Sequence, residues 1–327
     1  MSKAQSEFGT LQTAIIYFSN YENCHKFMVA LRWGTEGKVK CPTCGAEKVT
    51  YLAKARQWKC YAKHPRPKFT LKTGTVFEDS PIGLEKWLPV MWMLVNCKNG
   101  ISSWEIHRAM GVTQKSAWFM LQRGRLALQD LSCNKIGGEI EVDETFIGGK
   151  SRNMHPAKRA EKIHGRGPYA GGKAIVMAML ERGGKVVTKV VEERSTKILQ
   201  GHIHDNVEAG SDVFTDALMA YCGLSKSYAH QIIDHAEAYV DGNIHTNGCE
   251  NFWSLLKRSL GGTYVSVEPF HLFRYIDEQA FRYNNREVTD DLRFRMAMRQ
   301  IVGRRLTYKE LIGKSDAPEA GASPEAF

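Results

Sequence analysis

Three acidic residues in the C-terminal half of the chain stand where a predicted strand ends or a predicted helix begins. Asp143 closes one strand, Asp216 follows a short apolar strand, and Glu250 opens an amphipathic helix. Carboxylates placed in this way can converge on two divalent cations, which prefer oxygen ligands. Two such cations about 4 Å apart activate a nucleophilic oxygen and stabilise the leaving oxygen of a phosphodiester. The order of the three residues therefore predicts a domain with metal-dependent phosphodiester chemistry.

Several neighbours leave the assignment around Glu250 open. Lys257 lies two helical turns after Glu250 on the same face, so we expect it to grip a phosphate beside the metals. Asn247 and Asn251 flank Glu250 and offer neutral oxygen ligands. His245 is either a contact to DNA or to a metal ligand, or a loop histidine that the backbone satisfies.

Further acids surround Asp143 on its own strand. Period-two alternation places Glu139 and Glu141 on the face of Asp143 and turns Glu144 to the other face. A single carboxylate at any of these positions is more often a solvated surface group. The ordered set of strand Asp, further strands, strand Asp and helix Glu is much harder to obtain by chance.

A cysteine pair marks a second kind of site near the N-terminus. Cys41 and Cys44 form a CxxC motif, which Cys60 and His64 follow among short strands. Three thiolates and an imidazole give zinc a closed tetrahedral site, and short strands without a core of their own need such a metal. The alternative is a pair of reduced thiols, and the basic, Pro-rich surroundings do not favour a redox motif.

The chain of 327 residues is basic, with 45 Lys and Arg against 35 Asp and Glu and a net charge of +10. Positive charge concentrates in the blocks 38–72 and 150–173, which is typical of proteins that neutralise phosphates, although either block alone fits a solvated surface equally well. We expect DNA contacts from the two blocks and from the residue after Lys257. These candidate residues are Arg56, Arg66, Lys68, Lys158, Arg159, Arg166 and Arg258.

The stretch 82–130 is predicted to be entirely helical. Ser102 and Ser103 resemble a helix N-cap, Gly111 breaks the chain, and Thr113 caps the next helix. Two helices joined by a short Gly-containing turn predict a helix-turn-helix. We expect its second helix to present basic side chains to base edges, namely Lys115, Arg123 and Arg125.

The remaining pattern predicts helices within 1–37 and a β-meander that starts near residue 139. A helix is expected from Ala217, and a strand near 231–234. The longest apolar run, Trp87 to Cys97, is too short to span a bilayer, and no signal-peptide core is visible. These features argue against a secreted or membrane protein, and we expect a cytoplasmic, nucleoid-associated one.

Nearly the whole chain resembles a bacterial insertion-sequence transposase of the DDE type, in the branch with an N-terminal zinc ribbon. The matching stretches are Cys41-Pro-Thr-Cys44-Gly, Thr73-Gly-Thr-Val-Phe77, Val142-Asp143-Glu144-Thr145, Phe214-Thr215-Asp216, His245-Thr-Asn-Gly-Cys-Glu250-Asn-Phe-Trp253 and Arg282-Tyr-Asn-Asn-Arg286. The last two stretches are long and specific.

The resemblance implies a mixed α+β chain whose RNase H-like, mixed-sheet catalytic domain uses Mg²⁺ (or Mn²⁺) to cleave the ends of the element and join them to target DNA. Carried over residue by residue, its triad is Asp143, Asp216 and Glu250, and Lys257 matches the basic residue that follows. Members of this branch can use Asn in place of Glu, which keeps Asn247 and Asn251 as lesser candidates. The second ligand pair of the ribbon, Cys60 and His64, departs from the four-cysteine pattern because a histidine replaces the last cysteine.

We therefore expect four regions: an N-terminal helix with a zinc ribbon (1–78), a helix-turn-helix region (79–135), the catalytic domain (136–312) and a disordered tail (313–327). The expected partners are double-stranded DNA at the inverted-repeat ends and the target, bound by a homo-oligomer, and the expected metals are Zn²⁺ and Mg²⁺. Two alternatives stay open. One is a DNA-binding regulator with an inactive nuclease-like domain, and the other is a nuclease that hydrolyses without strand transfer.

Overall fold

The computed structural model describes residues 8–131, 134–149, 155–162, 173–233 and 245–314. The chain divides into two compact units, each treated by itself below. Unit 1 consists of Met1–Cys97, Ile101–Leu128 and Val288–Phe327, and unit 2 of Lys98–Gly100 and Gln129–Glu287.

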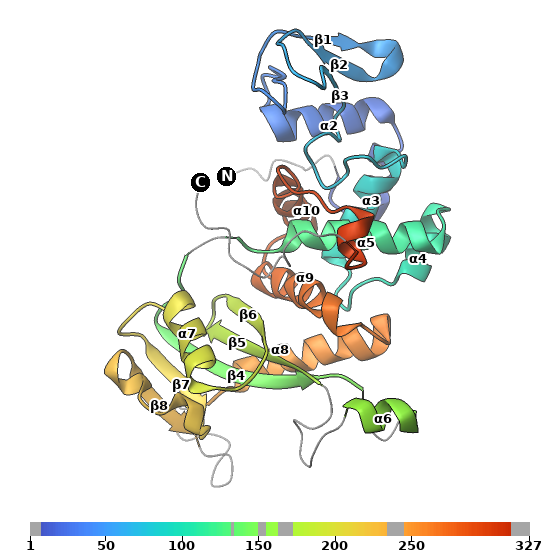
Figure 1. The fold of residues 1–327 in the computed structure, drawn as a ribbon. Coiled ribbons are helices and arrows are strands. Elements are labelled where there is room, and N and C mark those ends of the chain that lie inside the picture. Colours follow the sequence, from blue (N-terminus) through green and yellow to red (C-terminus); the bar gives the residue numbers. More distant parts are fainter. Residues whose placement is uncertain (1–7, 132–133, 150–154, 163–172, 234–244, 315–327) are drawn as a thin grey trace. The chain divides into compact units, whose positions relative to one another are not determined.

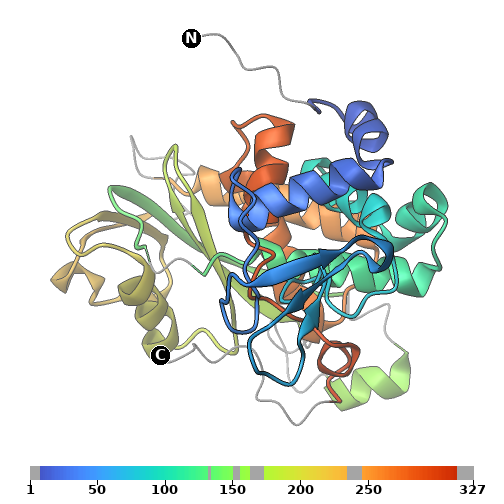
Figure 2. The ribbon, with the colours of Figure 1, turned by 90° about the horizontal axis from the view of Figure 1, so that it is seen from above.

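Unit 1 begins with two helices and a small antiparallel sheet. The helices are α1 (Leu11–Phe18) and α2 (Tyr21–Trp33), and the sheet has the order β1 (Val49–Leu52), β2 (Gln57–Cys60) and β3 (Lys68–Phe69). Figure 2 shows these three strands in blue beside α2. The strands have little core of their own: Trp58 stacks on Phe69, and His25 of α2 stacks on Trp58.

Three further helices of unit 1 follow the ribbon: α3 (Leu84–Asn96), α4 (Ser103–Met110) and α5 (Gln114–Leu128). Ser102 caps α4 in a capping box with Glu105, and the chain turns at Gly111. The Thr113 hydroxyl then accepts the N–H of Ser116 and begins α5. Two capped helices joined by this turn agree with the predicted helix-turn-helix.

The segment after residue 287 returns to unit 1. It contains α10 (Asp290–Arg299) and α11 (Tyr308–Leu311). The ring of Phe294 on α10 lies within 6 Å of four aromatic rings, those of Phe8, Phe18, Phe27 and Trp92. The structure thus differs from the expected catalytic domain 136–312, because the apolar face of α10 completes the helical core of unit 1.

Unit 2 is built on one five-stranded mixed sheet with the order β6-β5-β4-β7-β8. The strands β4 (Glu139–Ile147), β5 (Ala174–Glu181) and β6 (Val186–Val191) form the expected antiparallel meander. The strands β7 (Asp212–Asp216) and β8 (Ala229–Ile233) extend the sheet in parallel on the other side of β4. This central first strand, with a meander on one side and parallel strands on the other, confirms the predicted RNase H-like mixed sheet.

Helices cover both faces of this sheet (Figure 1). The helix α7 (Thr196–Asn206) packs Leu199 and Ile203 into a core with Ile140 and Val142 of β4. On the opposite face lie α8 (Asn247–Arg258), which continues as a π-helix over Ser259–Tyr264, and α9 (Leu272–Asn284). Their apolar side chains pack on the other face of β5, against Val176 and Ala178. Unit 2 also contains the short helix α6 (Pro156–Lys162).

One expected element of unit 2 differs from the prediction. The helix expected from Ala217 is instead two short 3-10 turns, Met219–Tyr221 and Leu224–Lys226, because Gly223 between them has a positive φ. The expected disordered tail lies outside the described residues from 315 onward. Among the described residues, no helix is both long and apolar enough to cross a membrane.

Candidate active site and zinc site

Two of the predicted acids lie next to each other on the central strands of unit 2. Glu141 of β4 pairs with Phe214 of β7 in a parallel register, and the chain reaches Asp143 and Asp216 two residues further on each strand. Because side chains alternate along a strand, both carboxylates share the face that α8 covers. Sheet register therefore brings together two residues that are far apart in the sequence.

The third acid, Glu250, lies in the first turns of α8 and is exposed. Its helix is fixed on the same face by Cys249, Phe252 and Trp253, which are buried against β5 and α9. The indole Nε1–H of Trp253 donates a 2.8 Å hydrogen bond to Oδ2 of Asp143. The helix that carries Glu250 is thus held directly against the strand that carries Asp143.

Asp143 is buried and lies near enough to Asp216 and Glu250 for their charges to affect its ionisation. Burial raises the pKa of Asp143, and the charges of Asp216 and Glu250 raise it further. Hydrogen bonds from Trp253 and from the backbone N–H of Glu144 act in the opposite direction. Carboxylate oxygens of this kind are the ligands that hard divalent cations prefer.

Glu144 and Arg194 form an ion pair beside the acids. An Nη atom of Arg194 lies 2.8 Å from a carboxylate oxygen of Glu144 and 3.9 Å from one of Asp216. Burial raises the pKa of Glu144 to about 7, and the charges of Asp216 and Asp143 add to the rise, whereas Arg194 opposes it. Arg194 therefore supplies positive charge near Asp216. Nothing in the sequence had indicated it.

The acids on the strands have exposed neighbours on α8. The neighbours of Glu250 on α8, which are Asn247, Asn251, Lys257 and Arg258, are all exposed. Exposed amide and cationic groups on this helix are accessible to a nucleic acid.

The four predicted zinc ligands come together in unit 1. Cys41 Sγ lies 3.6 Å from His64 Nε2, and Cys44 Sγ lies 3.7 Å from Cys60 Sγ. Gly45 adopts φ +73°, which an L side chain rarely adopts, and its N–H donates to the Cys41 carbonyl to close the turn between the two cysteines. Burial tends to raise the pKa of the Cys41 thiol, but nearby N–H groups and thiols outweigh it and hold the pKa below its ordinary value. A low thiol pKa favours the thiolate that zinc binds.

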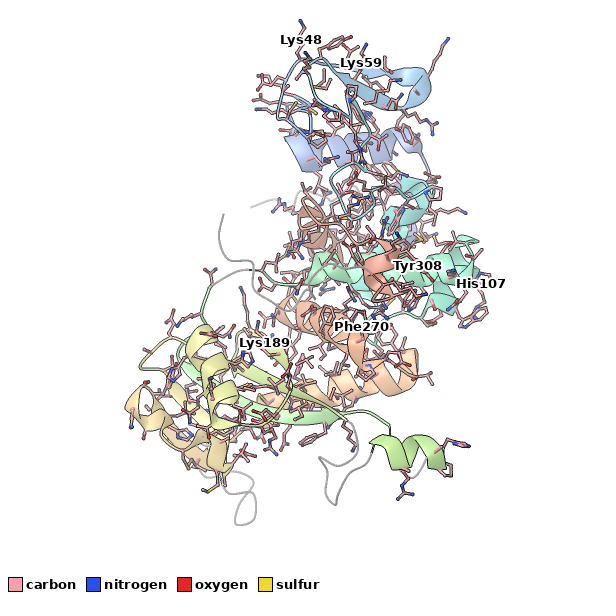
Figure 3. The ribbon with its side chains drawn as sticks, viewed as in Figure 1. Lys48, Lys59, His107, Lys189, Phe270 and Tyr308 are labelled. Atoms are coloured by element: carbon pink, nitrogen blue, oxygen red, sulfur yellow. The ribbon has the colours of Figure 1, made fainter. Side chains whose placement is uncertain are left out.

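The candidate DNA contacts fall into three groups. The side chains of Arg56, Arg66 and Lys68 are exposed on the ribbon, where Figure 3 shows their neighbours Lys48 and Lys59 at the outer edge. Lys115, Arg159 and Arg258 are exposed as well. Arg166 and the side chain of Lys158 lie outside the part that the structure describes.

The burial of two arginines on α5 contradicts the expectation that they read bases. Arg123 and Arg125 are 4% and 1% exposed. Arg123 donates from Nε to the Leu306 carbonyl and from Nη1 to the Glu78 carbonyl. The C-terminal half of α5 is buried on every side, because the segment around Leu306 covers the face that the sequence pattern left polar.

Comparisons with known proteins agree with this architecture. Residues 135–284 match the family model of the ISXO2-like transposase domain, and residues 19–62 match that of the transposase zinc-ribbon domain. A protein described as an uncharacterized protein in transposable element ISH50, from Halobacterium salinarum, is 28% identical over 255 residues. That similarity covers 74% of this chain and 84% of the relative.

Fold and site together define a nuclease-like protein with a zinc ribbon: an RNase H-like sheet with acids on its central strands, and a four-ligand cluster near the N-terminus. Both matched models describe transposase domains, so the chain carries a transposase zinc ribbon and an ISXO2-like transposase domain, and it resembles the insertion-sequence transposases of the DDE type with an N-terminal zinc ribbon. The resemblance stated from the motifs is confirmed.

Proposed function

We propose that the chain binds the inverted-repeat ends of an insertion sequence, cleaves them and joins the freed 3′-hydroxyls to target DNA. The observation that carries the proposal is geometric: strand register brings Asp143 and Asp216 to matching positions on one face of the sheet, and the hydrogen bond from Trp253 to Asp143 holds the helix of Glu250 over that face. These three side chains are the proposed Mg²⁺ ligands. Asn247 and Asn251 are alternatives to Glu250, because they lie on the same helix.

Bound divalent ions supply Lewis-acid activation of the attacking oxygen and stabilise the leaving oxygen of the phosphodiester. The chain's own residues orient the reaction. Trp253 and the N–H of Glu144 hold the two oxygens of Asp143, and the exposed ammonium of Lys257 lies further along the helix of Glu250, where it would contact a phosphate. Joining forms one phosphodiester bond as another breaks, so the reaction needs no high-energy cofactor.

Binding is assigned to the exposed basic residues of both units. On the ribbon these are Arg56, Arg66 and Lys68, on the helix-turn-helix Lys115, and in unit 2 Arg159 and Arg258. Such side chains neutralise phosphates and set the register of the protein on the duplex. A DNA complex with two element ends requires at least two active sites, so we propose a homo-oligomer in that complex.

The test is the Asp216→Asn variant with DNA that carries the element's terminal sequence. We expect end binding within about twofold of the wild type and loss of Mg²⁺-dependent nicking by at least about a thousandfold, because removing one ligand charge disables the metal site. Wild-type nicking rates in this variant would reject the assignment. A wild type that binds specifically but never nicks identifies a regulator, and nicking without joined products in a target plasmid identifies a hydrolytic nuclease.

A further inference from the structure

The buried carboxylate of Glu141, two residues before Asp143 on β4, contacts the helix of Glu250. Its Oε2 accepts the N–H of Gly248 at 2.7 Å and the N–H of Cys249 at 3.1 Å, which are in the first turn of α8. The Sγ of Cys249 also donates to the Glu141 carbonyl at 3.4 Å. A carboxylate that accepts unpaired N–H groups at a helix N-terminus satisfies them and complements the helix dipole.

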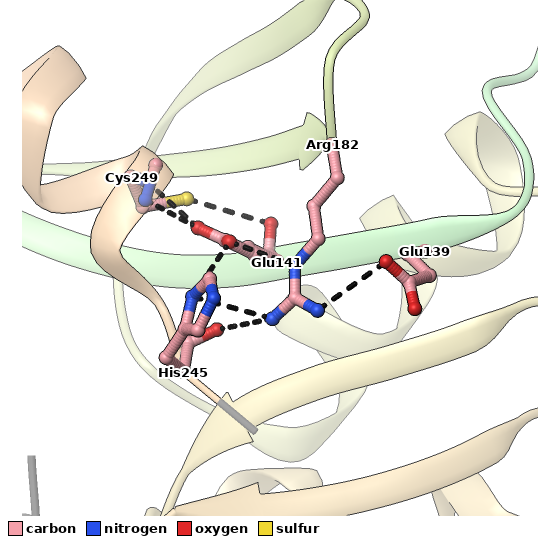
Figure 4. Close-up of polar contacts among 6 residues, drawn as sticks. Glu139, Glu141, Arg182, His245 and Cys249 are labelled. Atoms are coloured by element: carbon pink, nitrogen blue, oxygen red, sulfur yellow. Dashed lines mark hydrogen bonds and ion pairs between the residues drawn. The ribbon is translucent and has the colours of Figure 1, made fainter. Parts of the chain in front are cut away.

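The other oxygen of Glu141 faces two further groups (Figure 4). Its Oε1 lies 3.0 Å from Nε of Arg182 and 3.2 Å from Nδ1 of His245. Arg182 in turn donates to the His245 carbonyl at 2.9 Å and lies 3.3 Å from Glu139. We call Glu141, Arg182 and His245 the Glu141 cluster. Glu141 is 1% exposed, so its charge is stabilised by these partners rather than by water.

The Glu141 cluster reaches every element that carries a triad residue. Glu141 precedes Asp143 by two residues on β4, and its two amide donors come just before Glu250 on α8. The guanidinium of Arg182 lies 4.1 Å from the ring centroid of Phe214, which precedes Asp216 by two residues on β7. The cluster therefore forms a layer directly next to the three acids and connects β4, β7 and α8.

The close approach of α8 to Glu141 leaves no room for a side chain at Gly248. A Cβ atom there would lie 2.7 Å from Oε2 of Glu141 and 2.9 Å from Cδ2 of Leu180. Both distances are shorter than ordinary van der Waals contact. The height of α8 over the sheet is thus set by contact between a glycine backbone and this carboxylate.

We propose that Glu141 is a positioning residue that fixes Glu250 over Asp143 and Asp216 by clamping the N-terminus of α8 to β4. This inference rests on the proposed function, because it concerns the geometry of the proposed metal ligands. Glu141 does not touch the reacting atoms in this scheme. It acts through the two amides of α8 and through Arg182, which balances its charge.

The test compares Glu141→Gln with Glu139→Gln in the full-length, zinc-loaded protein. An amide has one acceptor and one donor end, so Glu141→Gln turns a donor either toward the α8 amides or toward Arg182. Glu139→Gln makes the same chemical change on the same strand face, at a carboxylate that also pairs with Arg182. Gly248→Ala disturbs the same contact from the helix side and keeps the charge of Glu141.

Two measurements decide the proposal. Amide hydrogen exchange of residues 247–250 reports the clamp without relying on activity, and the Mg²⁺ concentration for half-maximal nicking reports the position of Glu250. We expect Glu141→Gln and Gly248→Ala to raise the exchange rate and the Mg²⁺ concentration by at least about tenfold each. Substitutions of residues that support metal ligands usually have effects of this size. Glu139→Gln should stay within about twofold of the wild type in both measurements.

The proposal is overturned if Glu141→Gln and Glu139→Gln behave alike, or if exchange rises while the Mg²⁺ requirement stays at the wild-type value. A wild type that never nicks removes the proposed function instead, and the exchange comparison then decides alone whether Glu141 clamps α8. Thermal unfolding of each variant separates these results from misfolding. A variant that does not fold is replaced by Arg182→Gln, for which the same increases are expected.

Discussion

Trp253 and Asp143 are joined by a 2.8 Å hydrogen bond from the indole Nε1–H to Oδ2, which links helix α8 to strand β4 at the acidic triad. The bond stabilises the ionised carboxylate and so lowers the pKa of Asp143, against the rise caused by burial. This one contact therefore both orients the Asp143 carboxylate and opposes the rise in its pKa.

Replacing this donor should make the site more sensitive to acid. In Trp253→Phe the pKa of Asp143 rises, so protons compete with Mg²⁺ up to a higher pH and the acid limb of the nicking profile moves to higher pH. A hydrogen bond to a charged group contributes about 1.5–3 kcal/mol, so we expect about a tenfold higher Mg²⁺ requirement at pH 7. The control is Trp104→Phe, an exposed indole of unit 1. An unchanged pH profile in Trp253→Phe would show that the bond has no role in catalysis.

Zinc content should depend on His64 as much as on the cysteines. The wild type should hold about one zinc per chain, and His64→Ala should lose at least about tenfold in affinity in a chelator competition, because the closed site loses a ligand. His64→Cys should restore tight binding as a four-cysteine site. Cys222→Ser, which removes an exposed thiol outside the ribbon, should keep all of its zinc. Full zinc retention by His64→Ala would remove His64 from the ligand set.

Substitutions of two basic residues of α5 should have different effects, one on stability and the other on DNA binding. Arg123→Met breaks the buried hydrogen bonds to Leu306 and Glu78, so the free energy of unfolding should fall by about 2–4 kcal/mol while the folded protein binds DNA normally. Lys115→Ala, on the exposed side of the same helix, removes a cation–π contact to the ring of Tyr308, so the free energy of unfolding should fall by no more than about 1 kcal/mol. It should weaken DNA binding, and the dependence of the binding constant on salt concentration should fall by the amount expected for about one phosphate contact. Denaturant titrations and binding measured at several salt concentrations separate the two, and the reverse pattern would restore Arg123 to the DNA interface.

Protonation of His25 should lower the free energy of unfolding of unit 1 at acidic pH. Burial lowers the pKa of His25, which stacks on Trp58 of the ribbon. The unfolded chain therefore takes up this proton at a higher pH than the folded one, and the free energy of unfolding falls as pH drops below about 6.5. His25→Phe should gain stability relative to the wild type between pH 8 and pH 5, measured by denaturant titration. A difference that is constant across this range would contradict the prediction.

Local patterns in the sequence were enough to predict most elements of unit 2. Alternating and continuous apolar runs marked β4, β5 and β7, and the amphipathic pattern from Glu250 marked α8. The ribbon ligands were predictable for the same reason, because a CxxC turn presents two sulfurs within a few residues. Both predictions depend on residues that are close neighbours in the chain.

The partners of the acids could not be predicted in this way. Arg182 and Arg194 stand in loops whose sequence carries no periodic signal, and they reach Glu141 and Glu144 only through the pairing of distant strands. Likewise, α5 alone does not show that Leu306, 183 residues after Arg123, accepts its guanidinium. Long-range packing decides these contacts, and a single sequence does not display it.

The return of residues 288–314 to unit 1 means that unit 2 is an insertion within unit 1. A ribosome releases the ribbon and the helix-turn-helix first, yet Phe294 must arrive before their aromatic core can close. The nascent chain therefore completes unit 2 before the aromatic core of unit 1 can close. A product of premature termination after residue 287 would lack the ring of Phe294, so the helical core of unit 1 would stay incomplete even though all of unit 2 had been synthesised.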